Sequence, residues 1–159
     1  MDIRAVIKSQ YHAALAMFRQ TVQKCPHELW DDSAYKNQFW NIAAHALFYT
    51  HFYLHPCEED YQPWPEIDLS TRLFEQDEQN VTPPSQGKLL RYADFIGQQI
   101  DPMVDAVELT RASGFDWLPF NKLELQFYNL RHLMLHTGEL SERLWQSSGQ
   151  EVDWVGKSG

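Results

Sequence analysis

Apolar residues recur every three or four positions through four long segments of this 159-residue chain, and this periodicity limits the fold more than any other feature of the sequence. Such spacing places side chains on one face of an α-helix. It predicts helices at residues 3–24, 34–55, 86–112 and 121–147. No segment alternates well enough to predict a strand. Four amphipathic helices of about 20 to 27 residues are typical of a four-helix bundle, so the expected fold class is all-α.

Residues that stop or cap helices stand at the ends of these segments. Pro26 and Pro56 follow the first and second segments and cannot continue a helix. Ser33 is the predicted N-cap of the second helix. Asn121, with Glu124 three residues later, forms a capping-box pattern at the start of the fourth.

The connections between the predicted helices differ in length. Short links join the first helix to the second and the third to the fourth, so each of these pairs should be antiparallel. Residues 56–84 hold five of the eight prolines and eight acidic residues against a single Arg. A link this long is a crossover or has a function. We interpret it as a solvated crossover with one short helix near 70–74, and a substrate lid is the alternative. The bundle is expected to form one domain, residues 1–150, followed by a tail at 151–159.

Composition and charge exclude several classes of protein. Hydrophobic residues make up 43% of the chain, which favours a globular protein. The formal net charge is −9 and no Lys/Arg run occurs, which disfavours nucleic-acid binding. The N-terminus lacks the apolar core of a signal peptide, so a cytoplasmic location is expected, with Cys25 and Cys57 reduced and uninvolved. Residues 38–57 carry no charge, but their polar side chains would need partners in lipid, so no membrane span is predicted.

Two pairs of histidines are spaced four residues apart. His132 and His136 lie inside the predicted fourth helix, and His51 and His55 lie at the end of the second. A four-residue step brings two imidazoles to one helix face, about 6 Å apart, from which both can reach one metal ion. With seven histidines, about 0.3 such pairs are expected by chance, so one pair alone is weak evidence. Because His55 precedes Pro56, where helical geometry fails, the first pair is the better candidate.

A helical zinc pair needs a third ligand from another helix. His45 lies amid apolar residues of the second helix, and it matches the height of His132 if the second and fourth helices run parallel. His51 is the alternative, at the level of His136. It lies six residues after His45 and 240° further round the same helix, so His45 and His51 cannot both face one site. The fourth helix is apolar on more than one side, which predicts deep burial. From the residues alone, a metal site and ordinary core histidines remain alternatives.

Two motifs resemble those of the DinB-like superfamily, the DinB/YfiT-like metalloenzymes. One is FWNIAAHALFY, which resembles the family helix in which a Trp is followed closely by the first metal histidine. The other is RHLMLHTGELSERL, which resembles the last-helix signature of paired histidines followed by Gly, a polar residue and Leu. The resemblance covers residues 1–147. It implies a four-helix bundle with a long crossover between the second and third helices, and His45, His132 and His136 as metal ligands.

The resemblance also implies a function. Better-understood family members use a divalent metal, Zn or Ni among them, to activate a low-molecular-weight thiol for S-transfer or isomerisation; others are regarded as metal-dependent hydrolases, and many are homodimers. A thiol-transferase-like or hydrolase-like enzyme acting on a small electrophilic substrate, and a homodimer, are therefore expected. Three neutral imidazoles would leave an ion an open position for thiol or water. The alternative is a non-catalytic helical protein that binds a metal or a partner.

Other residues near the predicted ligands are candidates for supporting roles. Peptidases with a His-Glu-x-x-His motif have a Glu after the first histidine, where this chain has Leu133, so a peptidase is disfavoured. Glu139 is the candidate base or ligand-orienting group, and an exposed ion pair with Arg143 is its alternative role. The residues expected to line the pocket are Asn41, Tyr49 and Tyr128.

Overall fold

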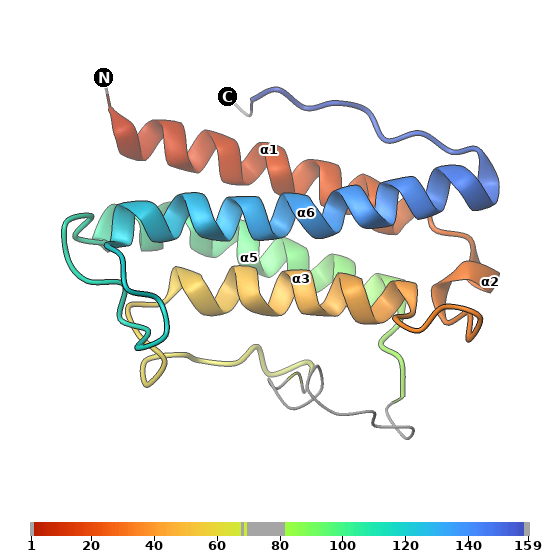
Figure 1. Ribbon diagram of the computed structural model, residues 1–159, viewed down its shortest axis with the longest axis horizontal. Helices are drawn as coiled ribbons and strands as arrows, with labels where there is room; N and C mark the ends of the chain where they lie inside the picture. Colours follow the sequence, from red (N-terminus) through yellow and green to blue (C-terminus); the bar gives the residue numbers. More distant parts are fainter. Residues whose placement is uncertain (1, 68, 70–81, 158–159) are drawn as a thin grey trace.

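Four long helices pack side by side as a bundle (Figure 1). The computed structural model describes residues 2–67, 69 and 82–157. The helices are α1 (Ile3–Lys24), the short α2 (His27–Trp30), α3 (Phe39–Leu54), α5 (Gln86–Ala106) and α6 (Lys122–Ser148). The predicted all-α four-helix bundle is confirmed. None of the described helices is both long and apolar enough to cross a membrane.

The four long helices form a ring in which α1 and α3 each contact α5 and α6. Helices α1 and α6 run in one direction, and α3 and α5 run in the other (Figure 1). The pairs predicted to be antiparallel, α1 with α3 and α5 with α6, are antiparallel but lie diagonally across the bundle. Because α3 and α5 are parallel, their link must return along the whole bundle, which confirms the long crossover.

The described part of this crossover packs against the bundle. Trp64, Ile67 and Leu69 are buried. The Trp64 ring stacks on Tyr92 of α5, with centroids 5.1 Å apart and planes 8° from parallel. This part of the link is therefore a packed cover over α5. The short helix predicted near residues 70–74 lies outside the described residues.

Helix α3 begins five residues later than predicted, with Gln38 rather than Ser33 as its N-cap. The reason is local turn chemistry. The Asp32 carboxylate accepts a hydrogen bond from the backbone N–H of Ala34 at 2.9 Å, and the Gln38 side chain donates to the carbonyl of Asp31. Such side-chain bonds to nearby backbone compete with helix formation.

Helix α5 ends at Ala106, six residues before the predicted end. The chain then folds back so that residues 109–113 pair with the start of α6: Lys122 N–H donates to Arg111 at 2.8 Å, and Leu123 N–H donates to Leu109 at 2.9 Å. An isolated β-bridge joins Ala112 to Asn121. Tertiary contacts thus replace the last helical turns that the periodicity predicted.

Helix α6 follows its prediction closely at both ends but not in its burial. Asn121 caps it by accepting from the N–H of Glu124, as expected. Leu125, Leu133 and Leu140 are fully buried. Phe127 and Leu135, in contrast, are 50% and 61% exposed. The prediction of deep burial on more than one side was wrong, because α6 lies at a corner of the bundle and only one face meets α1 and α3.

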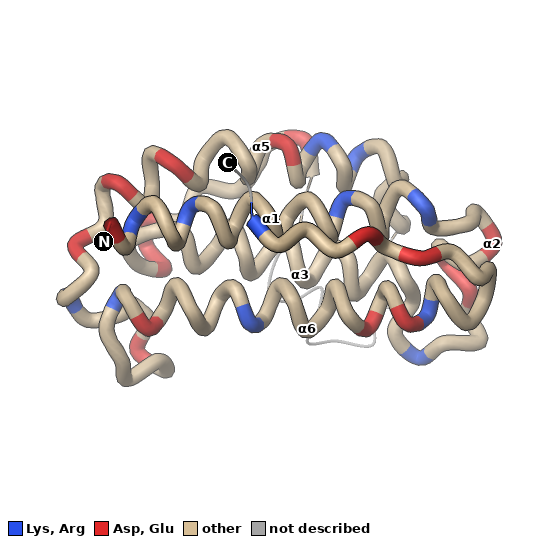
Figure 2. The backbone as a smooth tube through the Cα atoms, turned by 90° about the horizontal axis from the view of Figure 1, so that it is seen from above, with Lys and Arg blue, Asp and Glu red and all other residues tan. Residues whose placement is uncertain are grey.

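The C-terminal segment lies along α1 (Figure 1). Lys24 donates to the carbonyl of Glu151 at 2.7 Å, and Asp153 N–H donates to the Gln20 side chain at 2.9 Å. Trp154 is 78% exposed. Lys and Arg are spread among Asp and Glu along the helices instead of gathering on one face (Figure 2).

Candidate metal centre

Helices α3 and α6 meet as antiparallel neighbours, and their contacts fix which residues face each other. Near one end, the Asn129 side chain donates to the carbonyl of Thr50 at 3.0 Å; near the other, Arg143 donates to the carbonyl of Asn37 at 2.7 Å. His45 and His132 lie between these contacts.

The heights of His45 and His132 match, although the parallel orientation assumed from the sequence is wrong. His45 lies nine residues before the end of α3 at Leu54, and His132 lies ten residues after the start of α6 at Lys122. In an antiparallel pair these two distances are measured from the same end of the bundle. The two imidazoles therefore meet across the interface.

Three imidazoles converge at this level. His132 Nε2 is 3.0 Å from His45 Nε2 and 3.2 Å from His136 Nε2. All three ligand atoms lie within 4.8 Å of one another, and all three side chains are partly buried. Nitrogens bound to one ion at about 2.1 Å, with angles near 90–110°, would be about 3.0–3.4 Å apart. The two distances from His132 Nε2 fit a shared ion.

Hydrogen bonding alone does not account for the cluster. A neutral imidazole has one N–H, and His136 directs Nδ1 to the Glu139 carboxylate at 2.6 Å, so its Nε2 presents a lone pair. His132 Nε2 carries either a proton or a lone pair, so at most one of its two contacts with the other Nε2 atoms can be an ordinary hydrogen bond. His132 Nδ1 is buried and has no hydrogen-bond partner among the residues that the structure describes. A cation between the three Nε2 atoms would use all three lone pairs.

The environment keeps two of these imidazoles neutral. Burial, and then the neighbouring His136, lowers the pKa of His45 to about 4. Burial, followed by the same neighbour and by His45, lowers the pKa of His132 to about 3. Neutral imidazole is the form that binds a metal ion. Near neutral pH, both side chains are ready to act as ligands without losing a proton.

The structure places His45, and not His51, beside the other two histidines. His51 does not reach the cluster: it is 1% exposed and its Nδ1 lies 3.0 Å from the Tyr92 hydroxyl on α5. His55 lies beside it, with Nδ1 2.9 Å from the carbonyl of His51. His45 is the α3 residue that completes the group with His132 and His136.

Glu139 extends the cluster outward. Its carboxylate contacts His136 on the nitrogen that faces away from the other two imidazoles. Arg143, its alternative partner in the sequence, stacks on Tyr35 at 4.1 Å. Carboxylates in this outer position fix the orientation of metal-binding histidines. Leu133, at the position of the peptidase Glu, is fully buried in the core.

The predicted lining residues occupy different distances from the centre. The Tyr49 ring centroid is 4.7 Å from that of His45 and 5.5 Å from that of His132. Tyr128 lies one step further out, reached through Tyr53, whose ring is 5.6 Å from both tyrosines. Asn41 is half-buried one turn before His45. Aromatic rings thus form one wall beside the histidines.

Sequence reasoning missed Lys122, a buried lysine with only 5% of its surface exposed. A signal was available: Lys122 is the first residue of α6, where the helix dipole favours an acidic side chain and disfavours a cation. A lysine there requires another partner. It donates to the carbonyls of His55 and Pro56 at the end of α3.

Comparison with known proteins adds no relationship. No family model matches the chain, and no curated protein or solved structure is similar enough to count as a match. What stands on observation is therefore a helical bundle with a three-histidine cluster suited to a metal ion.

Proposed function

We propose that the chain is a metal-dependent enzyme of the DinB-like superfamily, in which His45, His132 and His136 hold one divalent cation, Zn or Ni. The observation that supports it most is the convergence of the three Nε2 atoms, two of them 3.0 and 3.2 Å from the third. The two sequence motifs supply exactly one histidine and one histidine pair, the same three residues. 

Within the described residues, no further His, Cys, Asp or Glu joins the three. Three protein ligands without a fourth are typical of catalytic rather than structural zinc sites. When bound, a divalent cation supplies Lewis acidity that lowers the pKa of a thiol or water molecule beside it. We propose transfer of that thiol or water to a small electrophilic substrate, with a low-molecular-weight thiol as the preferred partner.

The protein's own residues prepare this chemistry. Burial holds His45 and His132 neutral, so they do not repel a cation. Glu139 accepts from His136 and orients its Nε2 toward the centre. The Tyr49 ring lies beside His45 and His132 and offers a surface against which the carbon skeleton of a substrate can pack. Glu139 faces the outer nitrogen of a ligand, which supports an orienting role over that of a base.

Elemental analysis of the untagged protein tests the metal site. We expect about one divalent ion per chain in the wild type and its loss in His45→Ala and His132→Ala. His51→Ala is the matched control, since it removes an imidazole from the same helix outside the cluster. Retention of the ion by His45→Ala would contradict the proposed ligand set.

Catalysis needs a separate test. Conjugation of a small thiol to an electrophile should be accelerated by the loaded protein and abolished by a chelator, then restored by added metal. Activity that ignores the chelator would exclude a metal mechanism. A bound ion without any such activity would favour the alternative, a non-catalytic metal-binding protein. The homodimer stays a prediction.

A further inference from the structure

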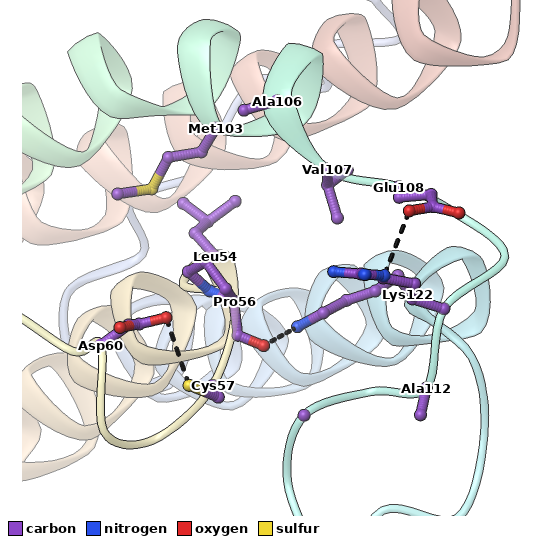
Figure 3. Close-up of a pocket in the computed structure, with 12 residues that line it drawn as sticks. Leu54, Pro56, Cys57, Asp60, Met103, Ala106, Val107, Glu108, Ala112 and Lys122 are labelled. Atoms are coloured by element: carbon purple, nitrogen blue, oxygen red, sulfur yellow. Dashed lines mark hydrogen bonds and ion pairs between the residues drawn. The ribbon is translucent and has the colours of Figure 1, made fainter.

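A second candidate site lies at the end of the bundle where α3 and α5 finish and α6 begins (Figure 3). It is a cavity of about 690 Å³ with mostly apolar walls that include Leu54, Met103 and Val107. Cavities of this size accept small molecules. Lys122 in its wall is ten residues before His132 on α6, about 15 Å along the helix axis. The cavity is therefore separate from the histidine cluster.

The walls of this cavity are firmly built. Gly114 has φ +83°, and a Cβ at this position would come within 2.0 Å of the carbonyl oxygen of Pro56. Only glycine allows that close approach, which seats the loop after α5 against the end of α3. The buried Ser113 hydroxyl donates to the carbonyl of Leu118 at 2.7 Å and closes the same loop. The cavity thus lies between two segments in close contact, the loop after α5 and the end of α3.

Lys122 brings a buried cation to this cavity. Its ammonium points across to the carbonyl of Pro56 (Figure 3) and also donates to that of His55 at 3.2 Å. It lies 5.2 Å from the centre of the Phe115 ring. Carbonyls at a helix C-terminus carry only partial negative charge. Among the described residues, no carboxylate forms an ion pair with Lys122.

The acidic groups that line the cavity are engaged elsewhere. Glu108 pairs with Arg111 at 3.1 Å, and the Cys57 thiol donates to Asp60 at 3.3 Å (Figure 3). A buried charge without a full counter-charge is costly. An ammonium has three N–H donors, and two carbonyls leave one of them for another acceptor. An anion that enters the cavity could therefore accept from the remaining N–H of Lys122.

We propose that this cavity binds a small carboxylate with an apolar body, its carboxylate on the Lys122 ammonium and its hydrocarbon part between α3 and α5. Arg111, which also lines the cavity, is already paired with Glu108, so among the described lining residues Lys122 is the cation left for the ligand. The apolar walls exclude a small hydrophilic anion such as phosphate as the preferred ligand, because it would leave the walls unfilled. The site does not depend on the metal centre.

Titration calorimetry with octanoate and with octanamide tests the proposal, since the two probes share a shape and differ in charge. We expect octanoate to bind the full-length protein about ten-fold more tightly than octanamide, as a charge-assisted hydrogen bond implies. Lys122→Met should remove this preference, and Lys36→Met, which removes an exposed lysine, should keep it. His132→Ala should bind octanoate as the wild type does, which separates this site from the histidines.

A second variant covers the case in which Lys122→Met fails to fold. Ala106 lines the cavity and is exposed, so Ala106→Phe fills the space without disturbing the core. It should weaken both probes at least about ten-fold, the range expected when an apolar contact surface is blocked. Equal binding of the two probes by the wild type, unchanged binding in Ala106→Phe, or no saturable binding of octanoate would each overturn the proposal.

Discussion

Two histidine pairs in this protein have the same spacing and opposite surroundings. His132 and His136 turn Nε2 toward each other, and His45 adds a third nitrogen at 3.0 Å. His51 and His55, also four residues apart, join no such group among the residues that the structure describes. The first pair lies partly buried between α3 and α6, and the second is buried at the end of α3.

The second pair is used for hydrogen bonding within the protein. His51 Nδ1 meets the Tyr92 hydroxyl, His55 Nδ1 meets the carbonyl of His51, and His55 Nε2 accepts from the N–H of Gln62 at 3.4 Å. These partners join α3 to α5 and to the crossover. The comparison teaches that spacing decides what two imidazoles can reach, whereas the atoms opposite them decide their role. Imidazole nitrogens that face one another can share a metal ion, whereas imidazole nitrogens that face a hydroxyl or carbonyl oxygen form hydrogen bonds within the core.

The largest expected difference between the pairs is in metal affinity. His132→Ala removes one of three ligands and should lower affinity by more than the roughly 10–100-fold that loss of an outer partner costs. His51→Ala should leave affinity within about two-fold, since it touches no ligand. Competition titration with a chromogenic zinc chelator measures both. Equal losses in the two variants would mean that the pairs do not differ as the geometry indicates.

Stability of the metal-free protein should reverse this order. His51→Ala leaves a cavity and removes one hydrogen-bond partner of the buried Tyr92 hydroxyl, so the free energy of unfolding should fall by about 2–4 kcal/mol. His132→Ala relieves nitrogen lone pairs facing one another and removes a partly exposed ring, so it should change stability by less than about 1 kcal/mol. Urea unfolding in the presence of a chelator provides both values. A larger loss for His132→Ala would contradict the distinction.

Glu139 offers a finer test of the first pair. Glu139→Ala removes the acceptor on His136 Nδ1 and should weaken metal binding about ten-fold while the ion remains bound at saturation. Glu142→Ala is the matched control, because Glu142 is an exposed residue on the same helix that contacts Gln146. An unchanged affinity in Glu139→Ala would show that the carboxylate orients nothing.

The helices were predictable because apolar periodicity and capping act locally. Helix α1 and both ends of α6 fall within one residue of their predicted limits. Residues 34–38 and 107–112 were wrongly assigned to helices, because a side-chain turn at Asp32 and tertiary contacts of the loop after α5 override the periodicity. Local pattern does not contain that information.

The candidate site was predictable in its residues but not in its orientation. The spacing of His132 and His136 and the apolar setting of His45 indicated the cluster, while the direction of α3 relative to α6 depends on how the long crossover closes. The cavity beside Lys122 could not be predicted from the sequence, since it forms only when the Gly114 loop meets the end of α3.

The smallest expected effect is the pH dependence of stability that comes from His51, in the buried pair. Burial, and then His55, lowers the pKa of His51 to about 3. Between that value and the ordinary value of 6.5 the unfolded chain binds the proton and the folded one does not, so stability falls as pH drops below 6.5. By pH 5.5 the loss from His51 should approach about 1.4 kcal/mol.

His51→Gln should remove this share of the acid sensitivity, whereas His27→Gln, which changes an exposed imidazole on α2, should not. Urea unfolding at pH 7.5 and 5.5 gives the difference for each protein. His45 and His132 add a dependence of the same sign, but they add it equally to both variants, so the difference between His51→Gln and His27→Gln isolates the share of His51. An unchanged pH dependence in His51→Gln would mean that His51 is charged in the folded protein. The second pair could then not be described as neutral side chains that pack in the core.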